Sequence, residues 1–171
     1  IIKYIDLDEE GKVTLENVKK AVTEHTKIIS LAQITNVLGY LAPIKEICNF
    51  AHEHDIIVCV DGAQSAPHHA VDVQDLDVDF FAFSGHKMCG PTGVGVLYGK
   101  YHLLDEMTPT RFGGGSNARY NSCGLVKLKN APTKFETGTP NIEGVIGLGS
   151  AIEYLQNIGM KNIEEHEAML R

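Results

Sequence analysis

Two short apolar segments of this sequence are each followed by side chains that can do covalent or acid–base chemistry. Asp61 and Gln64 follow Ile56–Val60, and Lys87 follows Asp79–Phe83. A lysine amine can form a Schiff base with an aldehyde, and a fixed carboxylate can keep a pyridine nitrogen protonated. Gln64 could donate a hydrogen bond to a phenolic oxygen on the same ring. The combination indicates a site for an aldehyde cofactor, pyridoxal phosphate (PLP).

The residues beside Lys87 could hold a phosphate group. Ser84 and His86 flank a glycine and precede the glycine-rich turn Gly90–Gly93, so a hydroxyl, an imidazole and backbone amides could cradle the anion. Neither a Walker A string nor a dinucleotide-binding glycine loop that opens a helix is present. Taken singly, Lys87 could be a solvated surface residue and Asp61 a turn former. The cofactor role requires a partly buried amine instead.

The spacing of apolar residues predicts the elements that position these groups. Strands are expected over Ile28–Ala32, Ile56–Val60, Asp79–Phe83 and Val94–Tyr98. Helices are expected over Thr14–His25, Pro43–Asp55, Glu143–Ile158 and Asn162–Leu170, with Thr14 as an N-cap and Gly159 as a stop. Continuous apolar runs such as Ile56–Val60 favour strands that are buried on both faces.

The order of the elements predicts an α/β fold with a mostly parallel sheet and one antiparallel strand. The connection before Val94–Tyr98 is too short for a helical crossover, so that strand should run antiparallel to its predecessor. Ligands of open α/β sheets bind beyond the carboxyl ends of the strands. Asn36, Asp61 and Lys87 each follow such an end. The stretch Thr108–Pro140 is expected to be irregular, and such stretches are usually functional or held by a partner.

Composition excludes several classes of function. The chain has 171 residues and a formal net charge of −7, which argues against binding to nucleic acid or to an anionic membrane surface. No apolar run approaches the ~20 residues that span a bilayer. The four cysteines form no CxxC pair and are expected to be reduced thiols in a cytoplasmic protein.

Other residues could hold a metal or act as a nucleophile, but their pattern does not favour it. His68 and His69 are adjacent and lack the helical spacing of metal-binding pairs, and the aspartates at 72, 75, 77 and 79 are expected to form a solvated connection. No metal site is therefore predicted. Cys89 is expected to be a small buried or half-buried thiol in a tight turn.

Several motifs together resemble the class V aminotransferase family of PLP enzymes. The motifs are Asp61-Gly62-Ala63-Gln64, Ser84-Gly85-His86-Lys87 and Gly90-Pro91-Thr92-Gly93. Three others add a similarity to the Suf-type (group II) cysteine desulfurases and selenocysteine lyases: Asn36–Gly39, Phe112–Gly115 and Phe135–Pro140. The likeness runs along nearly the whole chain. It implies the fold type I PLP architecture and a homodimer with active sites at the subunit interface.

The same resemblance implies a role for each matching residue. Lys87 would be the Schiff-base lysine, Asp61 would pair with the pyridine nitrogen, and Gln64 would contact the phenolic oxygen. The remaining implied contacts are Ser84 and His86 to the phosphate, Asn36 to the cofactor and the substrate carboxylate, and Thr139 to the phosphate of the other subunit.

The implied reaction releases sulfur from L-cysteine, or selenium from L-selenocysteine, with Lys87 as base. A cysteine thiolate would take the sulfur as a persulfide, leave alanine and pass the sulfur to an acceptor protein for iron–sulfur cluster assembly. The family's persulfide-forming cysteine has no match here. We therefore expect residues 1–171 to be the central part of the PLP-binding large domain, without the N-terminal segment and C-terminal small domain, and inactive alone. Two kinds of alternative stay open. One is another enzyme of the same fold: an aminotransferase, a kynureninase-like hydrolase or a racemase-like enzyme. The other is a non-catalytic binding or dimerisation module.

Overall fold

A four-stranded sheet organises the fold of this protein in a computed structural model that describes residues 1–120, 123 and 126–170. The strands lie in chain order and are β1 (Ile28–Ala32), β2 (Ile57–Asp61), β3 (Phe80–Ser84) and β4 (Gly95–Gly99). The first three are parallel and β4 is antiparallel to β3. This confirms the predicted α/β fold with one antiparallel strand.

The described α-helices are α1 (Leu15–Ala21), α2 (Ile44–His52), α3 (Val73–Leu76), α4 (Tyr101–Glu106), α5 (Ile142–Ile158) and α6 (Met160–Leu170). Four of them, α1, α2, α5 and α6, lie where the sequence predicts helices, and the short α3 and α4 were not predicted. Thr14 Oγ1 accepts a hydrogen bond from the Asn17 amide at 3.2 Å, which confirms the predicted N-cap. α1 ends earlier than predicted because Thr26 Oγ1 accepts from the Thr23 amide at 2.9 Å, a local bond that competes with the helix.

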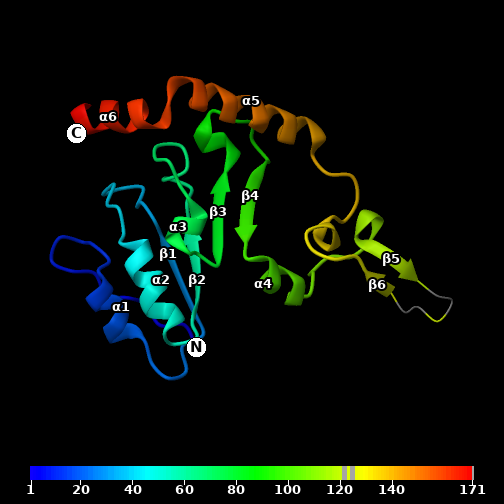
Figure 1. The fold of residues 1–171 in the computed structure, drawn as a ribbon, viewed down its shortest axis with the longest axis horizontal. Helices are drawn as coiled ribbons and strands as arrows, with labels where there is room; N and C mark the ends of the chain where they lie inside the picture. The colour runs from blue at the N-terminus through cyan, green and yellow to red at the C-terminus, as the bar shows by residue number, and fades with distance from the viewer. Residues whose placement is uncertain (121–122, 124–125, 171) are drawn as a thin grey trace.

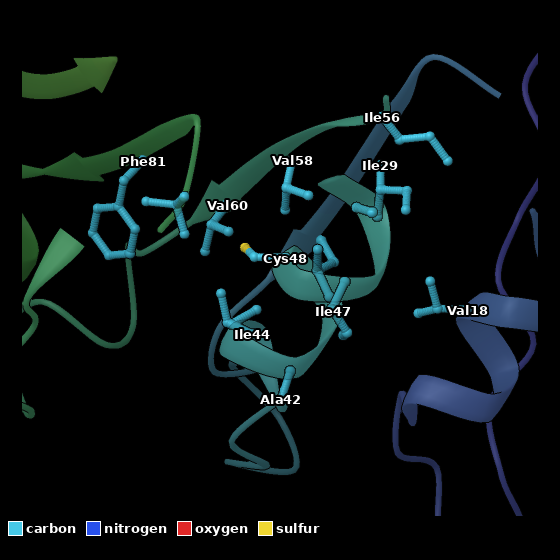
Figure 2. Close-up of a cluster of buried hydrophobic side chains, with 13 residues drawn as sticks. Val18, Ile29, Ala42, Ile44, Ile47, Cys48, Ile56, Val58, Val60 and Phe81 are labelled. Carbon is cyan, nitrogen blue, oxygen red and sulfur yellow. The ribbon is translucent and has the colours of Figure 1, made fainter. Parts of the chain in front are cut away.

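The main core lies between the sheet and α2 (Figure 2). The buried side of α2 is formed by Ile44, Ile47, Cys48 and Ala51, whose spacing places them on one helical face. They pack with buried residues of β2, among them Val58. Burying a large side chain of this kind stabilises the folded state by roughly 1.5–3 kcal/mol. This face of α2 is therefore the main contribution to the packing of the helix on the sheet.

The opposite face of the sheet differs from the prediction of strands buried on both sides. β3 has one fully buried residue among five, and alternate residues of β2, and of β1 beside it, are exposed or half-buried there. These residues line an apolar groove of about 600 Å³, formed by Ile28, Ser30, Ile57, Cys59, Phe80, Leu97, Leu103, Glu106 and Met107. Among the described helices, α4 contributes Leu103 and Glu106 to the lining of this groove. A continuous apolar run cannot reveal which covering elements a chain supplies.

Beyond the sheet, α5 and α6 run along the end toward which β3 points (Figure 1). The segment between α4 and α5 extends to the side of the sheet as an arm. It contains a hairpin of β5 (Asn117–Tyr120) and β6 (Val126–Leu128), where the sequence predicted only irregular structure. Part of that predicted stretch, residues 121–122 and 124–125, lies outside the described residues. No helix in the described part of the chain is long and apolar enough to cross a membrane.

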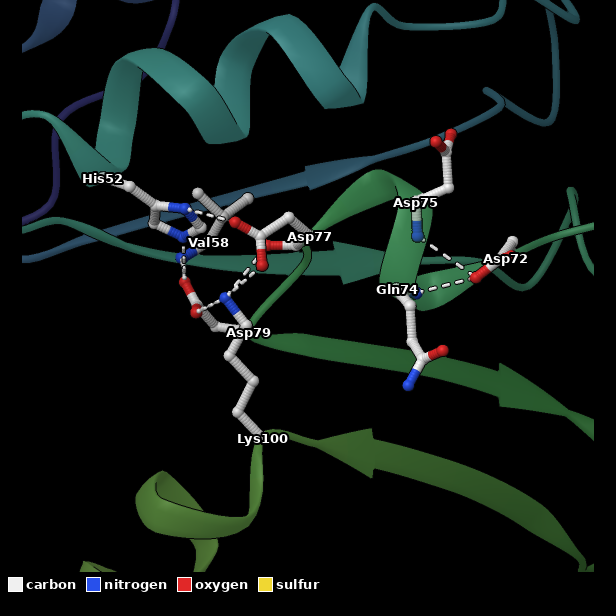
Figure 3. A network of polar contacts seen from close by, with 8 residues as sticks. All are labelled: His52, Val58, Asp72, Gln74, Asp75, Asp77, Asp79 and Lys100. Carbon is white, nitrogen blue, oxygen red and sulfur yellow. Dashed lines mark hydrogen bonds and ion pairs between the residues drawn. The ribbon is translucent and has the colours of Figure 1, made fainter.

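A polar network holds the amino end of β3 (Figure 3). Asp79 is 5% exposed, and its Oδ2 accepts from the Val58 amide at 2.7 Å and lies 2.9 Å from His52 Nε2. Lys100 Nζ lies 3.0 Å from Asp79 Oδ1 and 2.7 Å from Asp77 Oδ1. The expectation of a wholly solvated aspartate connection is therefore wrong for Asp79, because three donors compensate its burial.

Candidate functional site

Asp61 is the last residue of β2, and the sheet fixes its position on both sides. It is in register with Ala32 of β1 and Ala82 of β3, which places it at the carboxyl end of the parallel strands. Its side chain is exposed, and Oδ1 accepts from the Ala63 amide at 2.8 Å. The intervening Gly62 has no room for a side chain, because an added Cβ would lie 2.0 Å from Phe81 Cζ. The close packing of glycine and ring thus sets where the chain turns after Asp61.

A hydrogen-bonded turn carries Gln64 away from the strand. The Ser65 side chain is fully buried, and both the His68 and the His69 amides donate to the Ser65 carbonyl, at 3.0 and 2.8 Å. The Ser65 amide donates in turn to the Gly62 carbonyl at 3.1 Å. Gln64 lies half-buried within this compact turn. Its backbone is therefore held from both ends.

Lys87 lies in a 3₁₀ turn, Gly85–Met88, that follows β3 directly. In a 3₁₀ helix residues three apart eclipse each other, and here Gly85 and Met88 are both buried while His86 and Lys87 are exposed. Met88 packs with Leu148 of α5 in a second apolar cluster. The expectation of a partly buried lysine is therefore not met in this structure, because Met88 takes the buried side of the turn.

The loop beyond Lys87 is closed by backbone bonds. The Gly85 amide donates to the Val94 carbonyl and the Gly90 amide to the Gly85 carbonyl, both at 2.9 Å. Cys89 adopts a left-handed conformation with φ of 63° and is exposed. The prediction that this thiol would be buried or half-buried is wrong, because the reversal of the chain at Cys89 turns its side chain outward.

A hollow of about 520 Å³ brings two of the predicted site residues together. Its wall consists of Ile34, Thr35, Asn36, Gly39, Gln64, His68, His69, Glu164, Glu167 and Ala168. Asn36 and Gln64 thus come from loops after neighbouring strands and line the same space. Ser84 ends the next strand, β3, and His86 and Lys87 follow it; none of the three is part of this wall.

The hollow also contains residues whose part in the site the sequence did not reveal. His68 Nδ1 lies 2.6 Å from Glu167 Oε1, and His69 Nδ1 lies 3.1 Å from Glu164 Oε1. Both glutamates belong to α6, almost a hundred positions further along the chain. In the sequence the two histidines stand out only as possible metal ligands, and among the described residues no group of three or more His, Cys, Asp or Glu could hold a metal ion. No local pattern predicts a pairing over that separation.

Thr139 lies at the return of the arm and is exposed. Two residues later, Asn141 caps α5 by accepting from the Gly144 amide at 3.0 Å, and its Nδ2 donates to the Gly93 carbonyl at 3.4 Å. The chain at Thr139 therefore comes back beside the loop that follows Lys87. Thr139 itself is not in the wall of the hollow.

The predicted side chains offer a distinctive set of groups at one end of the sheet. They are a carboxylate, two carboxamides, two hydroxyls, an imidazole and an amine, from Asp61, Asn36, Gln64, Ser84, Thr139, His86 and Lys87. Within residues 1–120, 123 and 126–170, the amine of Lys87 forms no hydrogen bond or ion pair. Apart from the backbone bond to Asp61, the same holds for the other six side chains. These groups are available to a bound molecule.

The fold and these groups together define an α/β protein with a polar site at the carboxyl ends of its parallel strands. All of residues 1–171 match the family described as Aminotransferase class-V. The chain belongs to that family.

Known proteins similar to this chain are cysteine desulfurases and related enzymes. A probable cysteine desulfurase of Halalkalibacterium halodurans is 51% identical over 97% of the chain and 41% of its own length. The apo structure of a cysteine desulfurase from Thermococcus onnurineus is 39% identical, with a TM-score of 0.91 over 98% of the chain and 42% of the solved chain. A C-DES mutant with glycine covalently linked to its PLP cofactor is 28% identical, with a TM-score of 0.77 over 88% and 41%. The chain thus spans about two fifths of the length of the relatives it matches.

Proposed function

We propose that this chain forms the PLP-binding part of a cysteine desulfurase, the central part of the large domain. The observation that carries the proposal is the placement of Asp61 at the end of β2 and of Lys87 just after the adjoining β3, with both side chains exposed. A PLP enzyme of this kind needs an amine to bond the cofactor aldehyde and a fixed carboxylate to pair with the ring nitrogen. The similarity to cysteine desulfurases over nearly the whole chain supports the same conclusion.

The available groups fit PLP in kind and number. When bound, PLP supplies an aldehyde that bonds an amine and a protonated ring that withdraws electrons. Lys87 Nζ would hold the aldehyde carbon, and Asp61, whose Oδ1 already accepts from Ala63, would keep the ring nitrogen protonated. Ser84 and His86 would bind the phosphate, beside the exposed backbone of the glycine-rich loop.

The proposed residues divide the work on the substrate. Gln64 would donate to the phenolic oxygen of the ring, and Asn36, across the same hollow, would bind the substrate carboxylate. Lys87 Nζ, once released, would take a proton from the substrate Cα and return it to the product. The C–S bond of L-cysteine would then break as an enzyme thiolate takes the sulfur to form a persulfide, and Cβ would gain the proton that the substrate thiol loses, giving L-alanine. Selenocysteine would be handled by the same groups.

The same proposal extends to assembly and location. Cys48, Cys59 and Cys89 are reduced thiols, which suits the reducing cytoplasm, the compartment we propose. The arm and the exposed apolar side chains Ile142, Val145 and Ile146 of α5 support a homodimer, in which Thr139 would reach the phosphate of the partner subunit. A sulfur-acceptor protein for iron–sulfur cluster assembly would complete the pathway of the sulfur.

The test is the absorbance of lysine-bound PLP, measured on the complete protein that contains this chain. Titration with PLP is expected to give the band in the natural protein and in Lys161→Ala, a control lysine on the exposed side of α6. Lys87→Ala is expected to lose the band. Alanine formed from L-cysteine without any keto-acid acceptor would separate the desulfurase from an aminotransferase. A Lys87→Ala protein that keeps the band would refute the assignment.

A further inference from the structure

The turn that carries Gln64 is joined to α6 at two points. We propose that His68 and His69 are positioning residues for the site. By pairing with Glu167 and Glu164 they hold α6 against this turn and so set the shape of the hollow. We name these two pairs the His–Glu clamp. The inference deepens the proposed function and rests on it where it concerns PLP.

Hydrogen bonds within the turn connect the two histidines to the backbone beside Gln64. The amides of His68 and His69 both donate to the carbonyl of Ser65, the residue directly after Gln64. The Ser65 side chain is fully buried and its hydroxyl donates to the Gly62 carbonyl at 3.3 Å. A displacement of either histidine would therefore move the backbone of Ser65, and with it the position of Gln64.

The clamp also completes one wall of the hollow. Glu164, Glu167 and Ala168 of α6 lie opposite Asn36 and Gln64 in its lining. α6 contains no buried residue, and Met160 and Ile163 pack against the second apolar cluster while staying partly exposed. α5 and α6 form the layer above the carboxyl end of the sheet (Figure 1), and Gly159, with φ of 90°, separates them. The apolar contacts hold the start of the helix, and the two His–Glu pairs attach the stretch beyond it.

The spacing of the partners suits a two-point attachment. Adjacent residues on the turn meet glutamates three positions apart on the helix, which share one helical face. The two contacts together prevent the helix from rotating about its axis as well as from lifting away. A single contact would leave that rotation free.

The expected effect of breaking the clamp is modest. The four side chains are between 28% and 50% exposed, and solvent screens pairs of this kind. Removal of both pairs should weaken PLP binding by about three- to tenfold and should speed amide exchange in residues 62–69 by a similar factor. The 3₁₀ turn at Gly85–Met88 is anchored on α5 instead, so its exchange should not change.

The experiment compares Glu164→Ala/Glu167→Ala with Glu165→Ala in the complete protein. Glu165 is on the same helix, and its pairing with Lys161 at 3.6 Å does not involve the turn. Hydrogen exchange is measured without PLP, and the dissociation constant and visible circular dichroism band of bound PLP are measured separately. We expect the double variant to change all three and Glu165→Ala to change none. The double variant Glu164→Gln/Glu167→Gln keeps an acceptor for each histidine and should restore much of the binding.

The outcomes separate this inference from the proposed function. If the natural protein gives no PLP band, the proposed function fails while exchange in residues 62–69 still decides whether the clamp exists. If PLP binds but the double alanine variant behaves like Glu165→Ala in exchange and affinity, the clamp is refuted and the proposed function stands. A loss of thermal stability with unchanged affinity and circular dichroism would assign the pairs a structural role only and would also overturn the inference.

Discussion

Replacement of Asp79 by asparagine tests the polar network at the amino end of β3. Asp79 receives hydrogen bonds or an ion pair from the Val58 amide, His52 and Lys100 while it is almost completely buried. Asparagine has nearly the same shape but no charge and only one acceptor oxygen. Its amide group could still accept from the Val58 side and would then turn an N–H toward the Lys100 ammonium.

The magnitude follows from the contacts that are lost. A hydrogen bond to a charged group contributes about 1.5–3 kcal/mol, and the contact with Lys100 is lost while that with His52 is weakened. The natural protein incurs a desolvation penalty for burying the charge of Asp79. The neutral asparagine avoids this penalty, which offsets part of the loss. We expect Asp79→Asn to lower the free energy of unfolding by about 2–3 kcal/mol at neutral pH.

The pH dependence of this difference identifies its electrostatic origin. Burial alone would raise the pKa of Asp79, but the Val58 amide, His52 and Lys100 outweigh it and lower the pKa below its ordinary value. The unfolded chain therefore takes up the proton first as the pH falls. The natural protein should lose this stabilisation below about pH 4, whereas the asparagine variant has no proton to take up here.

Urea denaturation at pH 7 and at pH 3, followed by circular dichroism, measures both effects. Asp75→Asn is the control, because Asp75 is exposed and has one surface ion pair, with Lys45. We expect the control to change stability by less than about 0.5 kcal/mol. The reasoning is refuted if Asp79→Asn matches the control at pH 7, or if its deficit is as large at pH 3 as at pH 7.

Two further predictions concern the turn after β2 and the cysteines. Gly62→Ala should cost about 1–3 kcal/mol in urea denaturation, because the new methyl group would displace the Phe81 ring; an unchanged midpoint would contradict the close packing. Iodoacetamide at pH 8 should label the exposed Cys89 and spare Cys48, as peptide mass spectrometry would show. Burial, followed by the nearby carboxylate charges, raises the pKa of Cys48 to about 12, so equal labelling in the folded protein would oppose this account.

Local chemistry made much of the fold predictable. The β-branched run Ile28–Ala32 forms a strand with those bounds, Thr14 caps its helix, and Gly159 ends α5. The short connection after β3 correctly predicted the antiparallel direction of β4. These features depend on neighbours within a few residues, which a single sequence displays.

Features that depend on distant residues were not predictable. Three features depend on which elements meet in space: the apolar groove left on one face of the sheet, the burial of Asp79 and the contact of His68 with α6. The exposure of Lys87 follows from Met88 packing on Leu148, a residue of α5 that no local pattern connects to it. The roles of the individual site residues remain predictions.

The antiparallel direction of β4 has a thermodynamic consequence for the lysine. Ser84 and Gly95 are direct register partners, so the segment that carries Lys87 is a loop closed at its base by the sheet. A closed loop of residues 85–94 has already lost most of its conformational freedom when the protein folds. A molecule that bonds to this amine would restrict few further backbone states, so the entropy lost on binding falls mainly on the lysine side chain. Disrupting the pairing of β3 with β4 at Ser84 and Gly95 would free the loop backbone, and forming the same bond would then cost more conformational entropy.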